Sequence, residues 1–386
     1  MHKPVIPYLD AMASTPIDPL VAEAMLPYLT GHFGNPDSKH AYGAASQEAI
    51  YHARTQVARA IGASPESIHF TSGATEAINL ALKGAAHFYR KSGKHIITLQ
   101  TEHAATLESC AQLENAGYDL TYLAPNQDGL LSVDALQKAL RSDTILVSIS
   151  HVNSEIGVVQ NIASIAEIVA TNGALFHVDA AQSIGKCPLD VSQYPIAMLS
   201  LSAHKCHGPK GIGALYLRQK PKVHLQALLH GGKQEAQYRA GTLATHQIIG
   251  MGAAYALATE HMAQNLAHIQ MLADTLHAGL QTIPDIQING CLQPRVPHNL
   301  NVTFYHVPGD ILFSHLQQEI AISSGSACNS HKLTISPVLQ ALGLSRAEAN
   351  ATIRYSLSKM NTLADIQKAI TATQRIVAAL RNPDNV

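Results

Sequence analysis

Four stretches of the sequence place a chemically useful polar residue at or just after the end of a short apolar run. Asp179 ends one run, Lys205 follows the next run along the chain, and His103 follows an earlier one. Residues 71–76, which contain a glycine, follow a fourth run and open a helical pattern. Because parallel sheets bind ligands at the carboxyl ends of their strands, each of these positions is a candidate for ligand binding.

Each feature also has an ordinary structural explanation. Residues 71–76 could form a plain glycine turn with a threonine cap, and His103 and Asp179 could cap helices. Taken in chain order, the set fits one cofactor. Free N–H groups at 71–76 would hold a phosphate, Asp179 would pair with a protonated pyridine nitrogen, and Lys205 would form a Schiff base. With His103 to stack on the ring and move protons, the set predicts pyridoxal phosphate chemistry.

Motifs for other parallel-sheet chemistries are incomplete. A dinucleotide-binding fingerprint needs a third glycine after Gly211 and Gly213, and these two also lie late in the chain. A phosphate-binding loop needs Ser or Thr after its Gly-Lys pair, whereas Lys94 is followed by His95. The sequence has no G-x-S-x-G motif, which argues against an α/β-hydrolase.

The elements that must position these residues alternate between strands and helices. Helical patterns separate many of the short apolar runs, so the sequence predicts an α/β fold with a mostly parallel sheet covered on both faces. The predicted strands are 68–71, 96–100, 120–123, 145–149, 176–179, 198–201 and 214–217.

A second, smaller α+β domain is expected after a long helix at 245–280. We expect a large cofactor-binding domain at 15–260, and a small domain made of 1–14 and 261–386. Strands are predicted at 298–304 and 352–357, and helices at 311–318 and 362–380; an earlier helix should begin after Asp18 and run to about residue 29. The small domain also contains residues 323–337, a small-residue, polar stretch that predicts a mobile loop.

Composition excludes several classes of function. The 386 residues carry a net charge of −1 and no long Lys/Arg run, which argues against DNA as a partner. No apolar run approaches the ~18 residues of a membrane span, and the N-terminus lacks the pattern of a signal peptide. Five widely spaced cysteines without a C-x-x-C pair argue against disulfides or structural zinc. We therefore expect a cytoplasmic protein without a permanent metal site.

Dense motifs across nearly the whole chain, from Tyr8 to about Leu380, resemble the class I cysteine desulfurases. This group, typified by the NifS and housekeeping iron–sulfur-cluster enzymes, belongs to the class-V aminotransferases. The matching stretches are 33–36 (FGNP), 70–76 (FTSGATE), 101–103 (TEH), 151–160 (HVNSEIGVVQ), 177–182 (HVDAAQ), 202–205 (SAHK), 208–213 (GPKGIG), 239–242 (RAGT), 323–328 (SSGSAC) and 353–356 (IRYS). The resemblance implies an aspartate-aminotransferase-like fold, which is fold type I of the pyridoxal-phosphate enzymes, and a homodimer. It also implies conversion of L-cysteine and an acceptor thiol to L-alanine and a persulfide.

The resemblance also implies roles at the cofactor, matched position by position. Lys205 would bind pyridoxal 5'-phosphate covalently, with His103 stacked on the ring and Asp179 at the pyridine nitrogen. Gln182 and Ser154 would lie at the ring oxygen. The phosphate would be held by Ala74, Thr75, Ser202 and His204, and by Thr242 from the partner subunit.

At the substrate, the resemblance implies that Arg354 binds the carboxylate of L-cysteine and that Asn35 lies near it. The planar guanidinium suits a carboxylate. Cys328 would be the nucleophile and persulfide carrier. Cys206 neighbours Lys205 but should point away from the cofactor, because alternate residues of a strand face opposite sides.

The remaining cysteines have ordinary explanations. Cys110 and Cys187 are expected to be small buried residues, and Cys291 an inert thiol in a turn.

Two departures from the family pattern affect partners and cofactor contacts. Ser154 stands where the family usually has asparagine, so its cofactor contact would be bridged by water or lost. The chain ends at Val386, before the tail with which housekeeping members dock an iron–sulfur scaffold, so weaker docking is expected. Sulfur acceptors would be such a scaffold or a tRNA-thiolation pathway. On a scaffold, the Cys328 persulfide would be a transient ligand of a nascent [2Fe-2S] cluster.

Two alternatives stay open at this stage. A selenocysteine lyase or another class-V transferase would share much of this site. A non-catalytic scaffold that binds pyridoxal phosphate should have lost Lys205, His103 or Cys328, and all three are present. The predicted loop around Cys328 favours the desulfurase.

Overall fold

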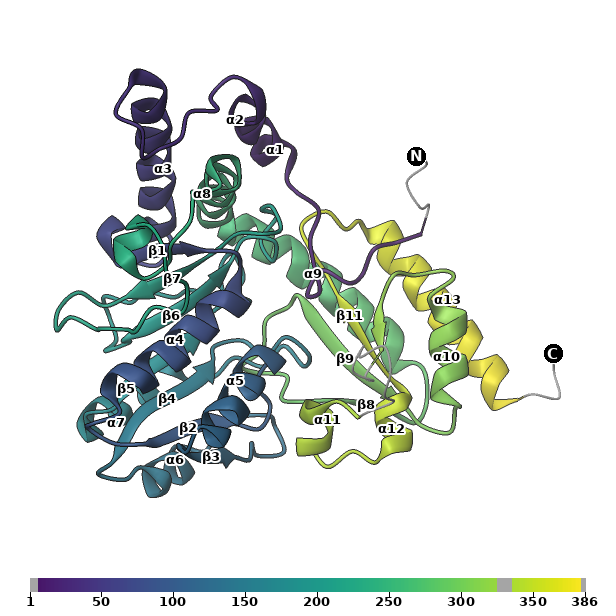
Figure 1. Ribbon diagram of the computed structural model, residues 1–386. Helices are drawn as coiled ribbons and strands as arrows, with labels where there is room; N and C mark the ends of the chain where they lie inside the picture. Colours follow the sequence, from purple (N-terminus) through teal and green to yellow (C-terminus); the bar gives the residue numbers. More distant parts are fainter. Residues whose placement is uncertain (1–5, 325–334, 383–386) are drawn as a thin grey trace.

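The computed structural model describes residues 6–324 and 335–382 and contains two sheets (Figure 1). The large sheet has seven strands in the order β1-β7-β6-β5-β4-β2-β3. All neighbours from β6 to β3 are parallel, whereas β7 runs antiparallel to both β1 and β6. The seven predicted strands and the mostly parallel α/β sheet are therefore confirmed. Their bounds are β1 (Ile68–Thr71), β2 (His95–Leu99), β3 (Asp119–Leu123), β4 (Thr144–Ser150), β5 (Leu175–Asp179), β6 (Met198–Ser202) and β7 (Gly213–Leu217).

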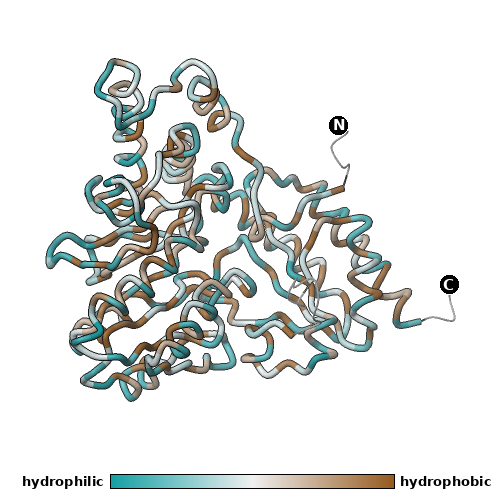
Figure 2. Tube along the Cα trace, in the orientation of Figure 1, coloured by the Kyte–Doolittle hydropathy of each residue, from teal (hydrophilic) through white to brown (hydrophobic). Residues whose placement is uncertain are grey.

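Helices cover both faces of this sheet, which explains why its strands read as continuous apolar runs. One core packs the sheet against α3, α6, α7 and α8, and another packs its opposite face against α4 and α5. The brown apolar stretches in Figure 2 follow these buried strands. The helices are α3 (Ala41–Arg59), α4 (Ala74–Tyr89), α5 (Ala104–Asn115), α6 (Val133–Ala139), α7 (Ile162–Asn172) and α8 (Thr245–Glu260).

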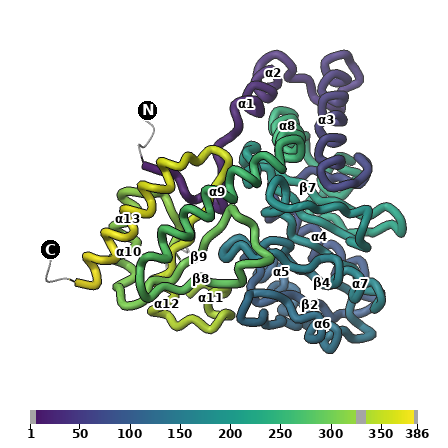
Figure 3. The backbone as a smooth tube through the Cα atoms, turned by 180° about the vertical axis from the view of Figure 1, so that it is seen from behind, coloured from purple at the N-terminus to yellow at the C-terminus, as the bar shows by residue number. Residues whose placement is uncertain are grey.

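The second sheet is small and antiparallel, in the order β10-β11-β9-β8. Its strands are β8 (Ile286–Ile288), β9 (Asn299–Phe304), β10 (Ser323–Ser324) and β11 (Thr352–Ser356). It packs against a core of its own with α9 (Met262–Gln281), α10 (Gly309–Leu316) and α13 (Leu363–Arg381). From behind, α9 and α13 lie side by side (Figure 3). Two short helices, α11 (Pro337–Ala341) and α12 (Arg346–Asn350), complete this part. The domain boundaries at residues 15 and 260 stay a prediction.

Two helices predicted as continuous are broken, so those predictions were wrong. The first divides into α1 (Pro19–Met25) and α2 (Pro27–Thr30), because a proline inside a helix removes an N–H donor. The second is interrupted at His261, whose backbone leaves the helical region at φ −100° and ψ 11°. The break lets α8 pack on the large core while α9 packs on the small one.

The N-terminal segment of residues 8–15 runs between the two sheets. Tyr8 forms a β-bridge with Ala321, and Asp10 forms one with Ser356 of β11. Further along the segment, Met12, Ala13 and Thr15 bond to His204 and Lys205, which follow β6 of the large sheet. Among the described residues, no helix is long and apolar enough to cross a membrane.

Gly213 allows β7 to pass close to the turn that precedes α4. A Cβ at this position would lie 2.5 Å from the Leu201 carbonyl oxygen and 2.6 Å from the Gly73 carbonyl carbon. Since both are backbone atoms, we expect Gly213→Ala to destabilise the protein by about 1–3 kcal/mol in urea unfolding. Gly31→Ala is the control, because its Cβ would have an ordinary 3.4 Å contact with the Pro27 carbonyl oxygen. Equal stability of the two variants would contradict this prediction.

Candidate active site

A cavity of about 940 Å³ lies at the carboxyl ends of the parallel strands and reaches the small sheet. Many of the residues predicted to form the site line this one cavity. They are Ala74, Thr75, His103, Ser154, Asp179, Gln182, Ser202, His204, Lys205 and Arg354. The expectation that strand ends supply a common site therefore agrees with the geometry, although the role of each residue stays a prediction.

The N-terminus of α4 is open toward this cavity. Gly73 is the N-cap, with φ 155° and ψ 177°, a conformation that favours glycine, and no side chain caps the helix. A Cβ on Gly73 would meet nothing within 4 Å. The first-turn N–H groups at Ala74 and Thr75 are therefore free of a side-chain cap, and they lie where the helix dipole favours an anion. The ordinary alternative of a threonine cap is excluded, and the turn suits a phosphate.

Lys205 lies after β6, with its amine held by two backbone carbonyls. Its Nζ donates hydrogen bonds of 2.7 Å to the carbonyl oxygens of Met12 and Ala13. Burial, and then the positive charges of Lys186 and Arg354, lower the pKa of Lys205 to about 8. Compared with an exposed lysine, more of the amine is unprotonated near neutral pH, which is the form that reacts with a carbonyl group.

Asp179 is a buried carboxyl at the end of β5. It accepts a hydrogen bond of 3.0 Å from the Ala181 N–H. Burial raises its pKa, while nearby His103 and Lys205 act in the opposite direction. A protonated ring nitrogen would supply the positive partner that favours the charged carboxylate, so Asp179 fits a pyridine cofactor.

His103 is both a helix cap and a residue of the cavity wall. It caps α5, because its Nδ1 accepts a 3.1 Å hydrogen bond from the Ala105 N–H, and it also lines the cavity. Since Nδ1 accepts, Nε2 carries the proton of the neutral ring. The cap therefore fixes the tautomer of the imidazole that faces the cavity.

The neighbouring polar groups are oriented by the N-terminal segment. Gln182 Nε2 donates to the Met12 carbonyl oxygen at 2.8 Å, which leaves its second N–H for a ligand. The ring of His204 lies 3.2 Å from the Ser14 hydroxyl, and burial lowers its pKa to about 4. A neutral histidine beside the start of α4 can still donate a hydrogen bond to a phosphate.

Arg354 enters the cavity from β11 and is held by several oxygens. Its Nη2 pairs with Asp10 Oδ1 and bonds to Ser323 Oγ, each at 2.8 Å, and its Nη1 donates to the Ser154 carbonyl oxygen at 3.1 Å. Its Nε is buried without a hydrogen-bond partner. The guanidinium therefore keeps an unused donor, as a carboxylate ligand requires. Ser154 contributes its backbone here, and its predicted contact with the cofactor stays a prediction.

Asn35 and Thr242 are exposed and do not line the cavity of their own chain. Asn35 Oδ1 accepts a 3.0 Å hydrogen bond from the Asp37 N–H. The Gln234 side chain links the two loops, since its amide bonds to Asp37 Oδ2 at 2.5 Å and to the Gly241 N–H at 3.1 Å. The two predicted residues thus lie on neighbouring loops at the surface.

Cys328 lies outside the described residues. The described residues on both sides of that segment, Ser323 and Ser324 before it and Ile335 and Ser336 after it, line the cavity.

The four described cysteines are free and none lines the cavity. Cys110 is buried, as predicted, whereas Cys187, which was also expected to be buried, is partly exposed. Cys206 is buried and Cys291 is partly exposed. Burial raises the pKa of Cys110, Cys187 and Cys206 to about 12, so these thiols are poor nucleophiles. The described residues contain no group of three His, Cys, Asp or Glu side chains placed to hold a metal ion.

Glu102 is a cavity residue for which the sequence suggested no role. Its Oε1 accepts from the Ser150 N–H at 2.9 Å and from the Ser150 hydroxyl at 3.1 Å, while Oε2 is buried without a hydrogen-bond partner. Burial raises the pKa of Glu102 to about 8. In the sequence, Glu102 lies between Thr101 and His103, just after a predicted strand, and this position could have indicated that it belongs to the site.

The sheet order, the lysine after β6 and the carboxyl at the end of β5 define an enzyme of pyridoxal-phosphate fold type I. Residues 7–369 match the family described as "Aminotransferase class-V", and the chain belongs to this family. Its cofactor is therefore pyridoxal 5'-phosphate.

Individual proteins that are similar to this chain include cysteine desulfurases. The chain is 50% identical over 378 residues to the cysteine desulfurase IscS of Pectobacterium atrosepticum, covering 97% of this chain and 93% of that relative. It is similar to a solved structure named NifS-like protein, with a TM-score of 0.91 and 34% identity over 97% of this chain and 100% of the other. A structure described as SspA in complex with cysteine has a TM-score of 0.82 and 39% identity, over 92% and 100% of the two chains.

Borohydride reduction of the yellow protein should attach the cofactor to the peptide that contains Lys205. In the apoprotein, the rate of this attachment should rise with pH and level off above about 8, because burial lowers the pKa of Lys205 to about 8 and the unprotonated amine reacts. Peptide mass spectrometry after reduction at several pH values measures both the attachment site and the pH dependence of the attachment rate. Attachment to Lys210, which lines the same cavity, would refute the assignment.

Proposed function

We propose that this chain is a cysteine desulfurase that converts L-cysteine to L-alanine and carries the released sulfur as a persulfide on Cys328. The observation that carries the proposal is the cavity in which Lys205, Asp179 and Arg354 meet beside the open start of α4. It offers an amine, a carboxylate for a ring nitrogen, a phosphate cradle and a guanidinium for an amino-acid carboxylate.

The residues divide the chemistry between them. When bound, pyridoxal 5'-phosphate supplies an electron sink for the negative charge that develops at the substrate α-carbon. Arg354 would orient the substrate through its carboxylate. The Lys205 amine would then take the proton from the α-carbon, a task suited to a base whose pKa is lowered to about 8. The proton on His103 Nε2 would be available for a further transfer in the same cavity.

Sulfur transfer needs a thiolate that can reach the substrate sulfur. The Cys328 thiolate would attack that sulfur, so that an S–S bond forms while the substrate C–S bond breaks and the carbon is protonated to give alanine. The sum, L-cysteine plus a thiol to L-alanine plus a persulfide, balances without an external oxidant. Two observations support Cys328: the described cysteines do not line the cavity, and the residues that flank its segment do.

Cys328→Ser should keep the yellow cofactor but lose sulfur transfer, because a hydroxyl is not ionised near neutral pH. We expect alanine release to fall by about 10³-fold or more, the scale seen when an enzyme loses its nucleophile. Alanine assays and mass spectrometry of the persulfide are the measurements. Cys291→Ser, which changes a partly exposed thiol away from the cavity, should retain most of the activity. Full turnover by Cys328→Ser would exclude the proposed carrier.

The proposal includes a homodimer, supported by an apolar surface on α1, α2, α3 and the loop between α2 and α3. Monomeric proteins rarely expose so many large apolar side chains together. Phe33 and Tyr42 stack here with ring centroids 5.6 Å apart. In a dimer through this surface, Asn35 and Thr242 would reach the partner's cavity, which explains why they lie outside their own. The exposed side chains are Leu20, Leu26, Leu29, Phe33, Tyr42 and Tyr51, each more than half exposed.

Phe33→Asp should therefore yield a monomer, because Phe33 is 72% exposed and a charge would be buried in the dimer. Light scattering should show half the mass of the parent, and cofactor should be lost more readily because the partner's Thr242 is absent. Met271→Asp on α9, 50% exposed, is the control and should remain dimeric. A parent protein that is itself monomeric would refute the dimer.

The sulfur acceptors are part of the same proposal. An iron–sulfur scaffold or a tRNA-thiolation pathway would receive the Cys328 persulfide. A relay that depends on a free thiol needs a reducing compartment such as the cytoplasm, which agrees with the four free cysteines described. Loading radiolabelled sulfur from L-cysteine, and identifying the proteins or RNAs that receive it, distinguishes the acceptors.

A further inference from the structure

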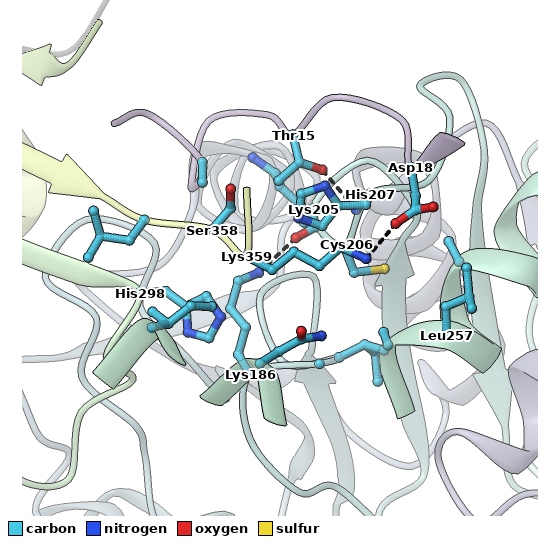
Figure 4. Close-up of a pocket in the computed structure, with 18 of the residues that line it drawn as sticks. Thr15, Asp18, Lys186, Lys205, Cys206, His207, Leu257, His298, Ser358 and Lys359 are labelled. Carbon is cyan, nitrogen blue, oxygen red and sulfur yellow. Dashed lines mark hydrogen bonds and ion pairs between the residues drawn. The ribbon is translucent and has the colours of Figure 1, made fainter. Parts of the chain in front are cut away.

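A second, small cavity lies against Lys205 (Figure 4), and none of the described residues that line it belongs to α4. Its volume of about 40 Å³ has room for water but not for a substrate. Lys205 lines both cavities, so the groups around the small cavity can influence the large cavity through Lys205. Among the labelled residues around it are Lys186, Lys205, Cys206, His207, His298 and Lys359.

Lys186 is a buried cation in this second cavity, with only 6% of its surface exposed. Its Nζ donates to the Lys205 carbonyl oxygen at 2.9 Å and to Gln182 Oε1 at 3.0 Å. Both acceptors are neutral, and no ion pair to Lys186 occurs in the described part of the chain. A buried ammonium without a carboxylate is costly, so its retention calls for a function.

The hydrogen bonds of Lys186 connect both ends of the Lys205 side chain. One reaches the backbone from which Lys205 projects. The other reaches Gln182, whose Nε2 bonds at 2.8 Å to the same Met12 carbonyl oxygen that receives the Lys205 amine at 2.7 Å. A closed ring of contacts thus runs from Lys186 through Gln182 and Met12 to Lys205 and back.

The charges around Lys205 show what Lys186 adds. After burial, Lys186 is the strongest influence that lowers the pKa of Lys205, followed by Arg354. Asp10 and Asp179 act in the opposite direction.

The groups that face Lys186 itself leave its charge without a permanent partner. They are the Cys187 and Cys206 thiols, the Lys205 amine and three histidines, His204, His207 and His298. Burial lowers the pKa of the three histidines, so they are neutral, and it raises the pKa of both thiols to about 12, so they are neutral too. The pKa of Lys186, lowered by burial to about 8, still leaves it mostly charged at pH 7.

We propose that Lys186 is a positioning residue that fixes the Lys205 backbone and the Gln182 side chain and, through its charge, favours the unprotonated Lys205 amine. A lysine beside a second cationic group is a known way to obtain a reactive amine. The inference rests on the proposed role of Lys205 in binding the cofactor. It assigns a function to a residue that touches neither the substrate nor the cofactor.

The test follows the visible absorbance of the bound cofactor as a function of pH, because its midpoint reports the protonation of the Lys205 nitrogen, the atom that is the free amine in the apoprotein. Lys186→Met removes the charge and should move the midpoint upward by about one pH unit, a tenfold change in the protonation equilibrium. Lys186→Arg keeps the charge and should restore the midpoint of the parent. Lys186→Gln keeps a hydrogen-bond donor without the charge and should behave like the methionine variant. It replaces that variant if the latter does not fold.

Lys359→Met is the matched control, because Lys359 lines the same cavity but pairs with Asp18 at 2.5 Å. Its midpoint should stay that of the parent, even if its unfolding temperature falls. A midpoint in Lys186→Met and Lys186→Gln equal to that of the parent, or an equal shift in Lys359→Met, would overturn the proposal.

Two further results separate this inference from the proposed function. Borohydride mapping in the parent protein tests only whether Lys205 carries the cofactor. If the cofactor is found on another lysine, the proposed function of the site fails, and the role of Lys186 fails with it. In the unmodified apoprotein, amine labelling of Lys205 should be half-maximal near pH 8, where its lowered pKa lies. If no charge-removing variant folds, labelling of Lys205 with the pH dependence of an exposed lysine would refute the proposal.

Discussion

The hydrogen bonds of residues 8–15 hold the two sheets in one arrangement, and the site depends on them. On one side, the Leu9 N–H bonds to the Ala321 carbonyl oxygen, and the Ser356 N–H of β11 bonds to the Leu9 carbonyl oxygen, each at 2.8 Å. On the other, the Thr15 N–H bonds at 3.0 Å to the carbonyl oxygen of His204, next to Lys205. The segment between these anchors supplies the carbonyls that hold the Lys205 amine. A displacement of the small sheet would therefore disturb that amine directly.

The same segment explains how opposite charges coexist in the cavity. Asp10 pairs with Arg354 at 2.8 Å, so the guanidinium has a carboxylate partner other than Asp179. Asp179 in turn keeps a raised pKa in its buried position. Each charged group thus has a partner or an environment of its own, and the central volume stays available for a cofactor and an amino acid.

Much of the large sheet could be predicted because strands buried on both faces have apolar sequences that end abruptly. The ends of these apolar runs indicated Asp179, Lys205 and His103 as candidate site residues, without knowledge of any contact in the folded protein. The Asp10–Arg354 pair could not be found this way, because 344 positions separate the two residues. No local sequence pattern marks Lys186, because residues far along the chain, such as Leu257 and His298, line the cavity around it. The roles of Asn35 and Thr242 came from resemblance alone.

The pairing of residues 8–15 with β11 has a consequence for biosynthesis. Asp10 is synthesised long before β11 (Thr352–Ser356), with which it forms a β-bridge. Loop-closure entropy over such a separation is unfavourable until the intervening sheet has formed. The large sheet can therefore fold during synthesis while the lysine still lacks the carbonyls that orient it. Completion of the amine site therefore waits until β11 has been synthesised.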